Sequence, residues 1–346
     1  MSSGRLRAAV VGASGYTGEK LLKILAGHPR VEVAFASSRQ HAGRSLSDVF
    51  PEIALGGAPL CFGEPDPGKI CAAAEVAFLA LPHGESAKIA APLLASGLRV
   101  LDLSADLRLK DRAVYREYYG VDAPGQDLID AAVYGSPETN RGALAGARLV
   151  AVPGCYPTSV LLALAPALAG GLVDPASVIV SSASSPTGAG RKVEAAYLFA
   201  ECHENMRAYG VVGHRHTPEM EQELSRVAGE GVTVQFVPHL VPLNAGIHTT
   251  VVASCRGAMP GQAALDGLYR DYYRGAPFVR VCAGRLPEVR RVAGTNVCEV
   301  AARADARTGR LLFFSAEDNL VKGAAGQAVQ CLNIIMGWKE EEGLVL

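Results

Sequence analysis

The sequence predicts a two-domain α/β protein, in which a doubly wound parallel sheet is followed by an α+β domain with a mixed sheet. Three observations support this fold class. The chain has 346 residues, which is more than one ordinary core accommodates. Its first part alternates continuous apolar runs with helical periodicity, whereas its later part has many strands and few helices between them. A glycine-rich turn follows the first apolar run directly.

The glycine-rich turn predicts a dinucleotide site. A strand predicted at residues 6–11 runs into Gly12-Ala-Ser-Gly-Tyr-Thr-Gly18, and helical periodicity follows over residues 19–26. This G-x-x-G-x-x-G pattern is a relative of the Rossmann-type G-x-G-x-x-G, in which glycine lets the backbone approach a pyrophosphate at the helix N-terminus. A merely tight turn is the alternative. The residues expected to hold the cofactor here are Gly12, Ser14, Gly15, Tyr16, Thr17 and Gly18.

The end of the second predicted strand, residues 31–36, indicates which nicotinamide cofactor is used. It is followed by Ser37, Ser38 and Arg39, where NAD-specific folds tend to carry Asp or Glu for the ribose 2′-hydroxyl. Two hydroxyls and an arginine suit a 2′-phosphate instead, so we expect NADP(H). An exposed loop arginine without a ligand is the alternative.

Two further predicted strands, residues 75–81 and 98–103, end on the same edge of the parallel sheet, where open α/β sheets bind ligands. Pro82 and His83 follow the first of them, ahead of a helix predicted over residues 85–95, and are expected to touch the cofactor. For His83, a loop histidine without a role is the alternative. Arg108 follows the second and is a candidate for clamping an anionic substrate group, because guanidinium binds phosphate or carboxylate in a bidentate manner.

Cys155 is the candidate nucleophile. It lies in Pro153-Gly-Cys-Tyr-Pro-Thr158, between a strand predicted at residues 148–152 and a strongly apolar segment at 159–169. At a strand-to-helix turn, the partial positive charge of the helix N-terminus favours thiolate over thiol. A thiolate is suited to covalent acyl chemistry. A buried structural cysteine is the alternative.

Two histidines and two cations are the other chemical candidates. His214 and His216 precede a helix for which Thr217 is the expected N-cap and Pro218 the first residue. In an extended chain both rings face the same way. We favour His216 as the acid/base because its backbone is fixed by the helix start, and we expect His214 to be less constrained. Arg191 and Lys192 end a glycine loop that either cradles an anion or simply turns the chain.

The rest of the second half is predicted from its periodicity. Residues 191–207 and 262–273 look helical, and a long helix is expected towards residue 336. Strands are expected at residues 178–185, 233–239, 245–255 and 278–282, with a hairpin formed by 297–304 and 311–316.

Composition excludes several classes of protein. The net charge is −1, with 49% hydrophobic and 19% charged residues, which offers no field for nucleic acid or an anionic membrane. The most apolar stretch is interrupted by Pro166 and two glycines, and no signal peptide is evident. The eight cysteines show no zinc-like spacing, so we expect no metal and a reduced, cytoplasmic protein.

Four motifs together give the sequence a resemblance to the N-acetyl-gamma-glutamyl-phosphate reductases, within the aspartate-semialdehyde dehydrogenase-like superfamily. The resemblance spans the whole chain, and its motifs are the glycine turn, the cysteine turn, His214-Arg-His-Thr-Pro-Glu219 and Asp318-Asn-Leu-Val-Lys-Gly-Ala-Ala-Gly-Gln327.

The resemblance implies a Rossmann domain of residues 1–154 with 320–346 and a catalytic and oligomerisation domain of residues 155–319. It also implies a small acyl phosphate substrate, attack by Cys155, reduction of the thioester by NADPH, and a homodimer or homotetramer. Asn319 would lie near the nicotinamide, and Arg108 with Arg191 or Lys192 would neutralise the phosphate. A carrier-linked aminoadipyl- or glutamyl-phosphate reductase, aspartate-semialdehyde dehydrogenase and a non-catalytic NADP sensor are the alternatives.

Overall fold

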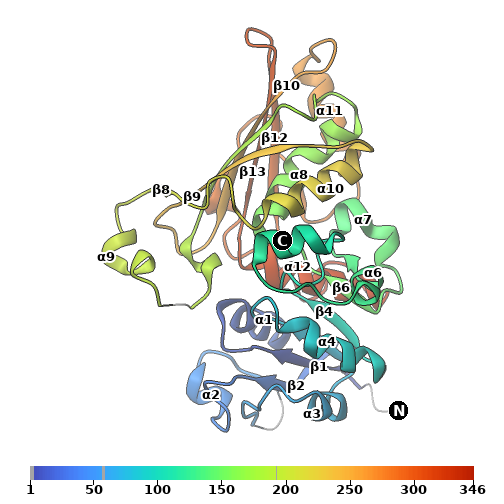
Figure 1. Cartoon of the computed structure of the whole chain (residues 1–346), viewed down its shortest axis with the longest axis vertical. Helices are drawn as coiled ribbons and strands as arrows, with labels where there is room; N and C mark the ends of the chain where they lie inside the picture. Colours follow the sequence, from blue (N-terminus) through green and yellow to red (C-terminus); the bar gives the residue numbers. More distant parts are fainter. Residues whose placement is uncertain (1–3, 57–58, 192) are drawn as a thin grey trace. The chain divides into compact units, whose positions relative to one another are not determined.

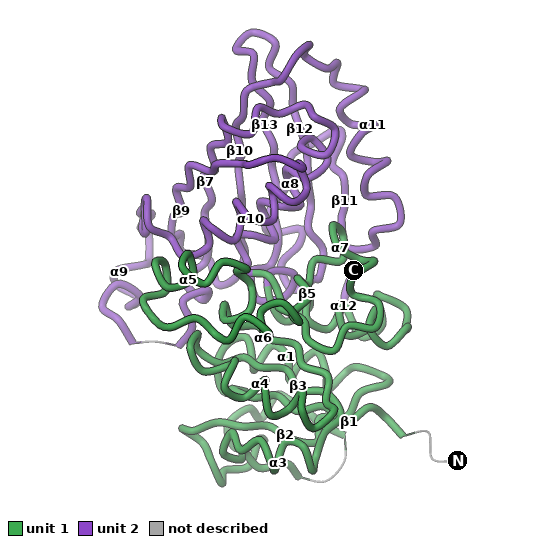
Figure 2. The backbone as a smooth tube through the Cα atoms, turned by 45° about the vertical axis from the view of Figure 1, so that its right-hand side comes forward, with its two compact units in different colours: residues 1–153, 324–344 green, residues 154–323, 345–346 purple. Residues whose placement is uncertain are grey.

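The computed structural model describes residues 4–56, 59–191 and 193–346. The chain forms two compact units, coloured separately in Figure 2. Unit 1 contains residues 1–153 and 324–344, and unit 2 contains residues 154–323 and 345–346.

Unit 1 is built on a six-stranded sheet with the order β2-β1-β3-β4-β6-β5, and every neighbouring pair is parallel. Its strands are β1 (Leu6–Val11), β2 (Val31–Ser37), β3 (Val76–Leu79), β4 (Arg99–Asp102), β5 (Val133–Tyr134) and β6 (Leu149–Ala151). The chain passes from β1 to β2 on one side and then to β3 on the other. The carboxyl ends of β1 and β3 therefore form a topological switch point, the usual ligand site of such sheets. The doubly wound parallel sheet predicted from the sequence is confirmed.

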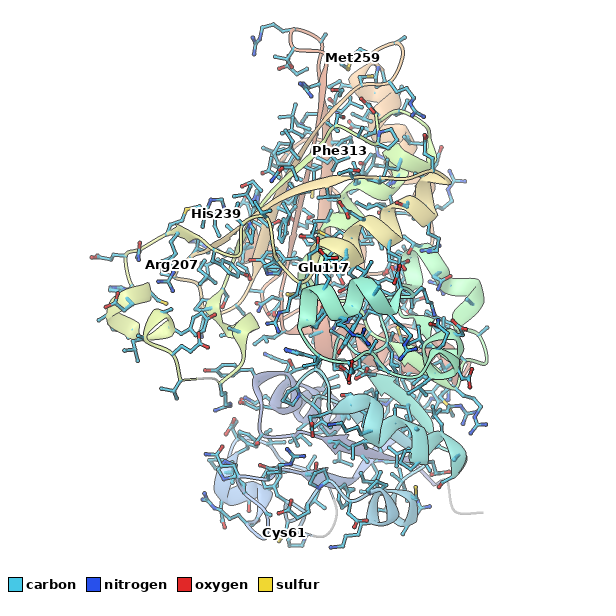
Figure 3. All side chains as sticks on the ribbon, viewed as in Figure 1. Cys61, Glu117, Arg207, His239, Met259 and Phe313 are labelled. Atoms are coloured by element: carbon cyan, nitrogen blue, oxygen red, sulfur yellow. The ribbon has the colours of Figure 1, made fainter. Side chains whose placement is uncertain are left out.

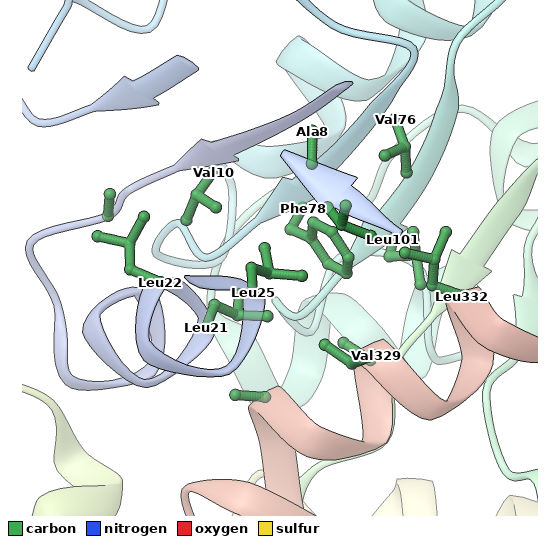
Figure 4. Close-up of a cluster of buried hydrophobic side chains, with 14 of the residues drawn as sticks. Ala8, Val10, Leu21, Leu22, Leu25, Val76, Phe78, Leu101, Val329 and Leu332 are labelled. Carbon is green, nitrogen blue, oxygen red and sulfur yellow. The ribbon is translucent and has the colours of Figure 1, made fainter. Parts of the chain in front are cut away.

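Helices cover both faces of this sheet. On one face, α1 (Tyr16–Ala26) and α12 (Gly326–Ile335) direct leucine and valine side chains onto β1, β3 and β4, and Figure 4 shows these residues converging. The other face packs against α3 (Pro67–Ala73), α4 (Ser86–Ala95) and α6 (Gln126–Ala131). Burial on both faces explains why these strands appear in the sequence as continuous apolar runs. The remaining helices of the unit are α2 (Leu46–Val49), α5 (Arg112–Tyr119) and α7 (Pro137–Leu144).

Unit 2 is built on a seven-stranded mixed sheet with the order β11-β12-β13-β10-β7-β9-β8. Figure 1 labels β8, β9, β10, β12 and β13 of this sheet. Its strands are β7 (Val178–Ser184), β8 (Arg207–Ala208), β9 (Val234–Leu240), β10 (Ile247–Ser254), β11 (Val279–Val281), β12 (Cys298–Asp305) and β13 (Arg310–Glu317). Pairing is antiparallel between β10 and both β7 and β13, and parallel between β7 and β9. The predicted hairpin is present as β12 and β13, and Gly309 in its turn has φ +69°. The mixed sheet predicted for the second domain is confirmed.

The inner face of this sheet carries α8 (Cys155–Ala169), α10 (Thr217–Ala228) and α11 (Gln262–Tyr272). Figure 3 labels Phe313 on β13, whose ring stacks on Tyr269 of α11 with 6.4 Å between ring centroids. Helix α8 is buried nearly all round, which explains its strongly apolar sequence. The hydroxyl of the fully buried Ser159 on this helix lies, at Oγ, 2.6 Å from Thr249 Oγ1 and 2.8 Å from Ser315 Oγ. Among the described residues, no helix is long and apolar enough to cross a membrane.

Some local predictions were wrong. Residues 191–207 do not form one helix: the described part contains a short 3-10 turn (Ala195–Tyr197) and the four-residue α9 (Phe199–Cys202). Apolar side chains there, such as Phe199, are exposed, so no buried face stabilises a longer helix. Helix α1 begins three residues, and helix α8 four residues, before the segment from which it was predicted. The first turn of α1 contains a glycine and that of α8 a proline, so neither turn shows apolar periodicity. The segment before α12 is a π-helix (Val321–Ala325).

Candidate active site

The glycine turn of unit 1 fits a pyrophosphate. Gly12 has φ +84°, and a Cβ there would lie 2.3 Å from Ala80 O, so only glycine can occupy the position. A Cβ on Gly18 would lie 2.4 Å from Gly12 O, so this glycine is required for α1 to pack closely on the turn that follows β1. At Gly15, a Cβ would meet only Gly12 O, at 3.7 Å. Gly15 is the N-cap of α1 and provides no side-chain cap, so the first-turn N–H groups, including those of the half-buried Tyr16 and Thr17, are available to an anion.

The hydroxyls after β2 hold this turn in place. Ser37 Oγ accepts a hydrogen bond from Gly12 N at 3.2 Å, and Ser38 Oγ lies 2.8 Å from Ser14 Oγ. Ser37 and Ser38 are buried, whereas the Arg39 side chain is 71% exposed and forms an ion pair with Glu85. The described residues at the end of β2 include the Arg39 guanidinium and no carboxylate, so this strand end fits a 2′-phosphate. Two of the predicted hydroxyls thus support the glycine turn, and contact of this loop with the cofactor stays a prediction.

Hydrogen bonds to Asp106 connect the loops that follow β3 and β4. Asp106 is fully buried, and its carboxylate accepts from Gly84 N at 2.6 Å, Ala87 N at 3.1 Å and Tyr115 OH at 2.8 Å. Burial, followed by the charge of Asp106, raises the pKa of Asp102 to about 6. This network fixes the start of α4 and the exposed Pro82-His83 loop that precedes it; the His83 ring lies edge-on to Tyr119.

Arg108 is buried, unlike an exposed arginine that clamps a substrate anion. It is 7% exposed, and its guanidinium donates to Val152 O from Nε and to Leu103 O from Nη2, both at 2.8 Å. These bonds join the ends of β4 and β6 just before the cysteine turn. A direct role in binding substrate stays a prediction.

Cys155 is the first residue of α8, with Gly154 as N-cap, as the strand-to-helix prediction required. Pro157 has no N–H, and Thr158 N donates to Gly154 O at 3.0 Å. The N–H groups of Cys155 and Tyr156 are therefore the first-turn donors beside the sulfur. Such N–H groups can stabilise a thiolate or an oxyanion.

Two buried glutamates and a glycine enclose the cysteine turn. Glu219, in the first turn of α10, is fully buried, and its Oε1 accepts from Gly154 N at 2.8 Å. Gly323 packs directly on the nucleophile: a Cβ there would lie 2.7 Å from Cys155 Cβ and 2.9 Å from Glu317 Oε1. The fully buried Glu317 ends β13. The sequence motifs contained Glu219 and Gly323, but their roles depend on tertiary contacts that no local pattern reveals.

His214 sits in an aromatic cage. Its ring centroid lies 5.1 to 5.5 Å from those of Tyr156, Tyr209, Phe236 and His216. His214 Nδ1 accepts from His216 N at 3.1 Å, which places the ring proton on Nε2. Burial and then the Arg215 charge lower the pKa of His214 to about 4. The expectation that His214 would be the less constrained ring is wrong, because aromatic packing holds it.

His216 is the N-cap of α10, so Thr217 and Pro218 are its first two helical residues, one position earlier than expected. The His216 ring lies 5.9 Å from that of Tyr156, which follows the nucleophile in sequence. Tyr209 donates to Tyr156 OH at 3.0 Å. Burial raises the pKa of both tyrosines, and negative charge on Cys155 adds to the effect, so both stay protonated. Unit 2 thus gathers Cys155, His214 and His216 around one tyrosine.

The last predicted site residues lie around the loop after β7. Asn319 is 2% exposed; its Oδ1 accepts from Gly246 N at 2.6 Å, and its Nδ2 donates to Thr187 Oγ1 at 3.1 Å. It fixes this loop, and contact with the nicotinamide stays a prediction. Arg191 is exposed at the end of the loop, and Lys192 lies outside the described residues. Among the described residues, no group of three or more His, Cys, Asp or Glu is placed to hold a metal ion.

Comparison with known proteins identifies the class first. Residues 7–147 match the family "Semialdehyde dehydrogenase, NAD binding domain", and residues 155–319 match "Semialdehyde dehydrogenase, dimerisation domain". Aspartate semialdehyde dehydrogenase II of Vibrio cholerae has the same fold, with a TM-score of 0.75 at 19% identity over 96% of this chain and 98% of that one. A parallel-sheet unit with a glycine turn and a mixed-sheet unit with a cysteine at the first position of α8 are thus the two halves of a semialdehyde dehydrogenase-type protein.

Relatives of higher sequence identity show the family within this class. The N-acetyl-gamma-glutamyl-phosphate reductase of Akkermansia muciniphila is 49% identical over 98% of this chain and 99% of its own length. That of Pelotomaculum thermopropionicum is 46% identical over 98% and 97%. The chain belongs to the N-acetyl-gamma-glutamyl-phosphate reductase family.

Proposed function

We propose that the chain reduces N-acetyl-L-glutamyl 5-phosphate to N-acetyl-L-glutamate 5-semialdehyde with NADPH and releases phosphate, a step of arginine biosynthesis. The observation that carries this proposal is the placement of Cys155 at the first position of α8, with Glu219 bonded to the preceding residue and Gly323 packed on the nucleophile. Full-length similarity to reductases of this name supports the choice of substrate.

Cys155 performs the acyl transfer. Its thiolate attacks the acyl carbon, the carbon–oxygen bond to the phosphate breaks, and inorganic phosphate leaves with the bonding electrons. The N–H groups at the start of α8 stabilise the oxyanion that forms on the way. The product is a thioester on Cys155, which accepts hydride far more readily than a carboxylate does.

NADPH, when bound by the glycine turn, supplies the hydride that reduces the thioester carbon. The carbon–sulfur bond then breaks, the aldehyde is released and the sulfur leaves as thiolate. His216 holds the thiolate and moves the proton, a role worth about 10²- to 10⁴-fold in rate. His214, whose pKa is lowered to about 4, is neutral at pH 7 and therefore poorly suited to donate a proton. Its part is to position the His216 backbone through the hydrogen bond at Nδ1.

Arg39 selects NADPH over NADH. Its exposed guanidinium follows β2, where an NAD-specific fold would carry an acidic residue. A charged hydrogen bond of this kind contributes about 1.5–3 kcal/mol, or about one to two powers of ten in affinity. Arg39→Ala should erode the preference for NADPH without impairing the use of NADH. Equal kcat/KM for the two cofactors in the wild-type protein would contradict this assignment.

Arg191, with Lys192 beside it in the sequence, is our candidate for binding the substrate phosphate, because it is exposed at the end of the loop that Asn319 fixes. Arg108 assists by holding the chain ahead of the cysteine turn.

The working protein is a homodimer or a homotetramer in this proposal. The face of the unit 2 sheet that points away from α8 carries apolar side chains in register: Val252 of β10 lies opposite Ile179 of β7 and Leu312 of β13. Ile179 is 48% exposed, although it belongs to an interior strand. An exposed apolar stripe of this kind is typical of an interface, and a second copy of the chain is the expected occupant. The match to a dimerisation domain over the same residues supports it.

We place the protein in the cytoplasm. The reaction draws on a reduced nicotinamide and a reduced cysteine, and the described residues contain no disulfide among eight cysteines.

The direct test is the reverse reaction. Purified protein should reduce NADP⁺ with N-acetylglutamate semialdehyde only when phosphate is present, and aspartate semialdehyde should be a much poorer substrate. Activity without phosphate, or a preference for aspartate semialdehyde, would overturn the proposal.

A further inference from the structure

Arg39 already has an anionic partner in the structure. Its Nη2 donates to Glu85 Oε2 at 3.1 Å. Arg39 follows β2, and Glu85 ends the loop that follows β3, so both lie at the carboxyl edge of the parallel sheet of unit 1. The guanidinium that would bind a 2′-phosphate is therefore already paired with a carboxylate.

The position of Glu85 is fixed by its neighbours. Gly84 N and Ala87 N, on either side of it, donate to the two oxygens of Asp106 at 2.6 and 3.1 Å. Asp106 is fully buried and also accepts from Tyr115 OH. The backbone around Glu85 is thus anchored to the interior of unit 1.

Glu85 is charged and has a second partner. Lys88 Nζ donates to Glu85 Oε1 at 2.8 Å. The Lys88 ammonium, followed by the Arg39 guanidinium, lowers the pKa of Glu85, so the carboxylate is ionised at neutral pH. Glu85 is the N-cap residue of α4, but its side chain makes no capping hydrogen bond. Its charge can therefore be removed without the loss of a helix cap.

We propose that Glu85 is a specificity-determining residue, which moderates the preference for a 2′-phosphorylated cofactor by competing with the phosphate for Arg39. The proposal rests on the NADP(H) specificity proposed above. The 2′-phosphate, with its higher negative charge, displaces the carboxylate, and Lys88 keeps Glu85 paired after the displacement. A cofactor with a 2′-hydroxyl leaves the Arg39–Glu85 pair intact, so the competition acts on NADP(H) and not on NAD(H).

The size of the effect follows from the exposure of the pair. The side chains of Arg39 and Glu85 are 71% and 35% exposed. Exposed ion pairs of this kind change an equilibrium by about 1.5- to 5-fold, and salt weakens them. Glu85 therefore adjusts cofactor selectivity, whereas Arg39 establishes it.

Equilibrium binding to the full chain tests the proposal, by calorimetry at fixed low ionic strength with NADP⁺, adenosine 2′,5′-bisphosphate and NAD⁺. In Glu85→Gln, the Kd values of NADP⁺ and the bisphosphate should fall by about two- to fivefold, and that of NAD⁺ should stay unchanged. Glu75→Gln is the matched control: it removes one exposed carboxylate paired with Arg7 at 3.6 Å, at the opposite end of β3. It should leave all three Kd values unchanged. In an Arg39→Ala background, Glu85→Gln should have no effect.

The outcomes separate the competing explanations. Equal tightening of NAD⁺ and NADP⁺ by Glu85→Gln would show a general charge effect and overturn the proposal. An unchanged Kd for the bisphosphate, or an effect that persists in Arg39→Ala, would overturn it too. These measurements need no turnover. Failure of the dehydrogenase assay would therefore count against the proposed function alone, and failure of the binding shift against the role of Glu85 alone.

Discussion

Gly323→Ala should inactivate the nucleophile while leaving the fold in place. A methyl group at this position would lie 2.7 Å from Cys155 Cβ and 3.1 Å from Cys155 Cα, whereas ordinary contacts begin near 3.4 Å. The third close atom, Glu317 Oε1 at 2.9 Å, ends a side chain and can move away. The Cys155 Cα belongs to the first turn of α8 and cannot move without shifting that turn.

The magnitude follows from this displacement. Relief of the overlap with Cys155 requires a shift of several tenths of an ångström to about 1 Å, and overpacking of this kind costs about 1–3 kcal/mol of stability. A misplacement of about 1 Å at a reacting group can lower the rate about 10²-fold. We therefore expect kcat of Gly323→Ala to fall by about 10², together with a modest loss of thermal stability.

Three measurements on Gly323→Ala check this reasoning: kcat of the phosphate-dependent reverse reaction, the alkylation rate of Cys155 by iodoacetamide, and Tm. Gly267→Ala is the matched control, because Gly267 lies inside α11 of the same unit with nothing within 4 Å of its Cβ position. The control should keep full activity and gain about 0.4–1 kcal/mol of stability. If Gly323→Ala keeps kcat within about threefold of the wild type, the close packing on Cys155 is not required for catalysis and the reasoning is refuted.

Substitutions at five further residues test other parts of the site. Cys155→Ser should lower kcat by several powers of ten and leave NADP⁺ binding intact; more than about a tenth of the wild-type rate would contradict covalent catalysis. Glu219→Gln keeps an acceptor for Gly154 N and should retain much more activity than Glu219→Ala, and equal losses would show that the charge matters instead. His216→Asn should cut kcat by about 10² or more and flatten one limb of the pH–rate profile, whereas His214→Asn, which alters only the positioning of His216, should lower kcat less and keep the shape of the profile; the reverse pattern would exchange their roles. Asp102 binds a proton between about pH 4 and 6 that the unfolded chain has released, so its raised pKa lowers stability as pH rises through this window. In Asp102→Asn, that part of the fall in unfolding free energy should vanish in urea titrations at each pH.

Much of the fold could be predicted from the sequence because its signals are local. The central strands β1 and β3 of unit 1 are largely buried, so they appear as mainly apolar runs, and Gly12 and Pro82 mark where the strands have ended. The strand-to-helix position of Cys155 was equally visible, since Pro153 and Gly154 interrupt the apolar sequence just before it.

The remaining features depend on contacts between distant segments. Glu219 was visible only as part of a motif, and its bond to Gly154 N joins residues 65 positions apart. The confinement of His214 could not be foreseen, because Tyr156 of α8 and Phe236 of β9 reach it from distant elements. The exposed segment with Phe199 was read as a helix because periodicity does not show whether a helix face will find a partner.

The most direct test of the central claim, that Cys155 carries the acyl group, is mass spectrometry of the acid-quenched intact protein. N-acetylglutamyl phosphate would be generated in situ from N-acetylglutamate and ATP by a kinase, without NADPH. The account predicts a single N-acetylglutamyl adduct that maps to Cys155 and disappears when NADPH is added. Full turnover without any adduct, or an adduct on one of the other seven cysteines that NADPH discharges, would contradict it.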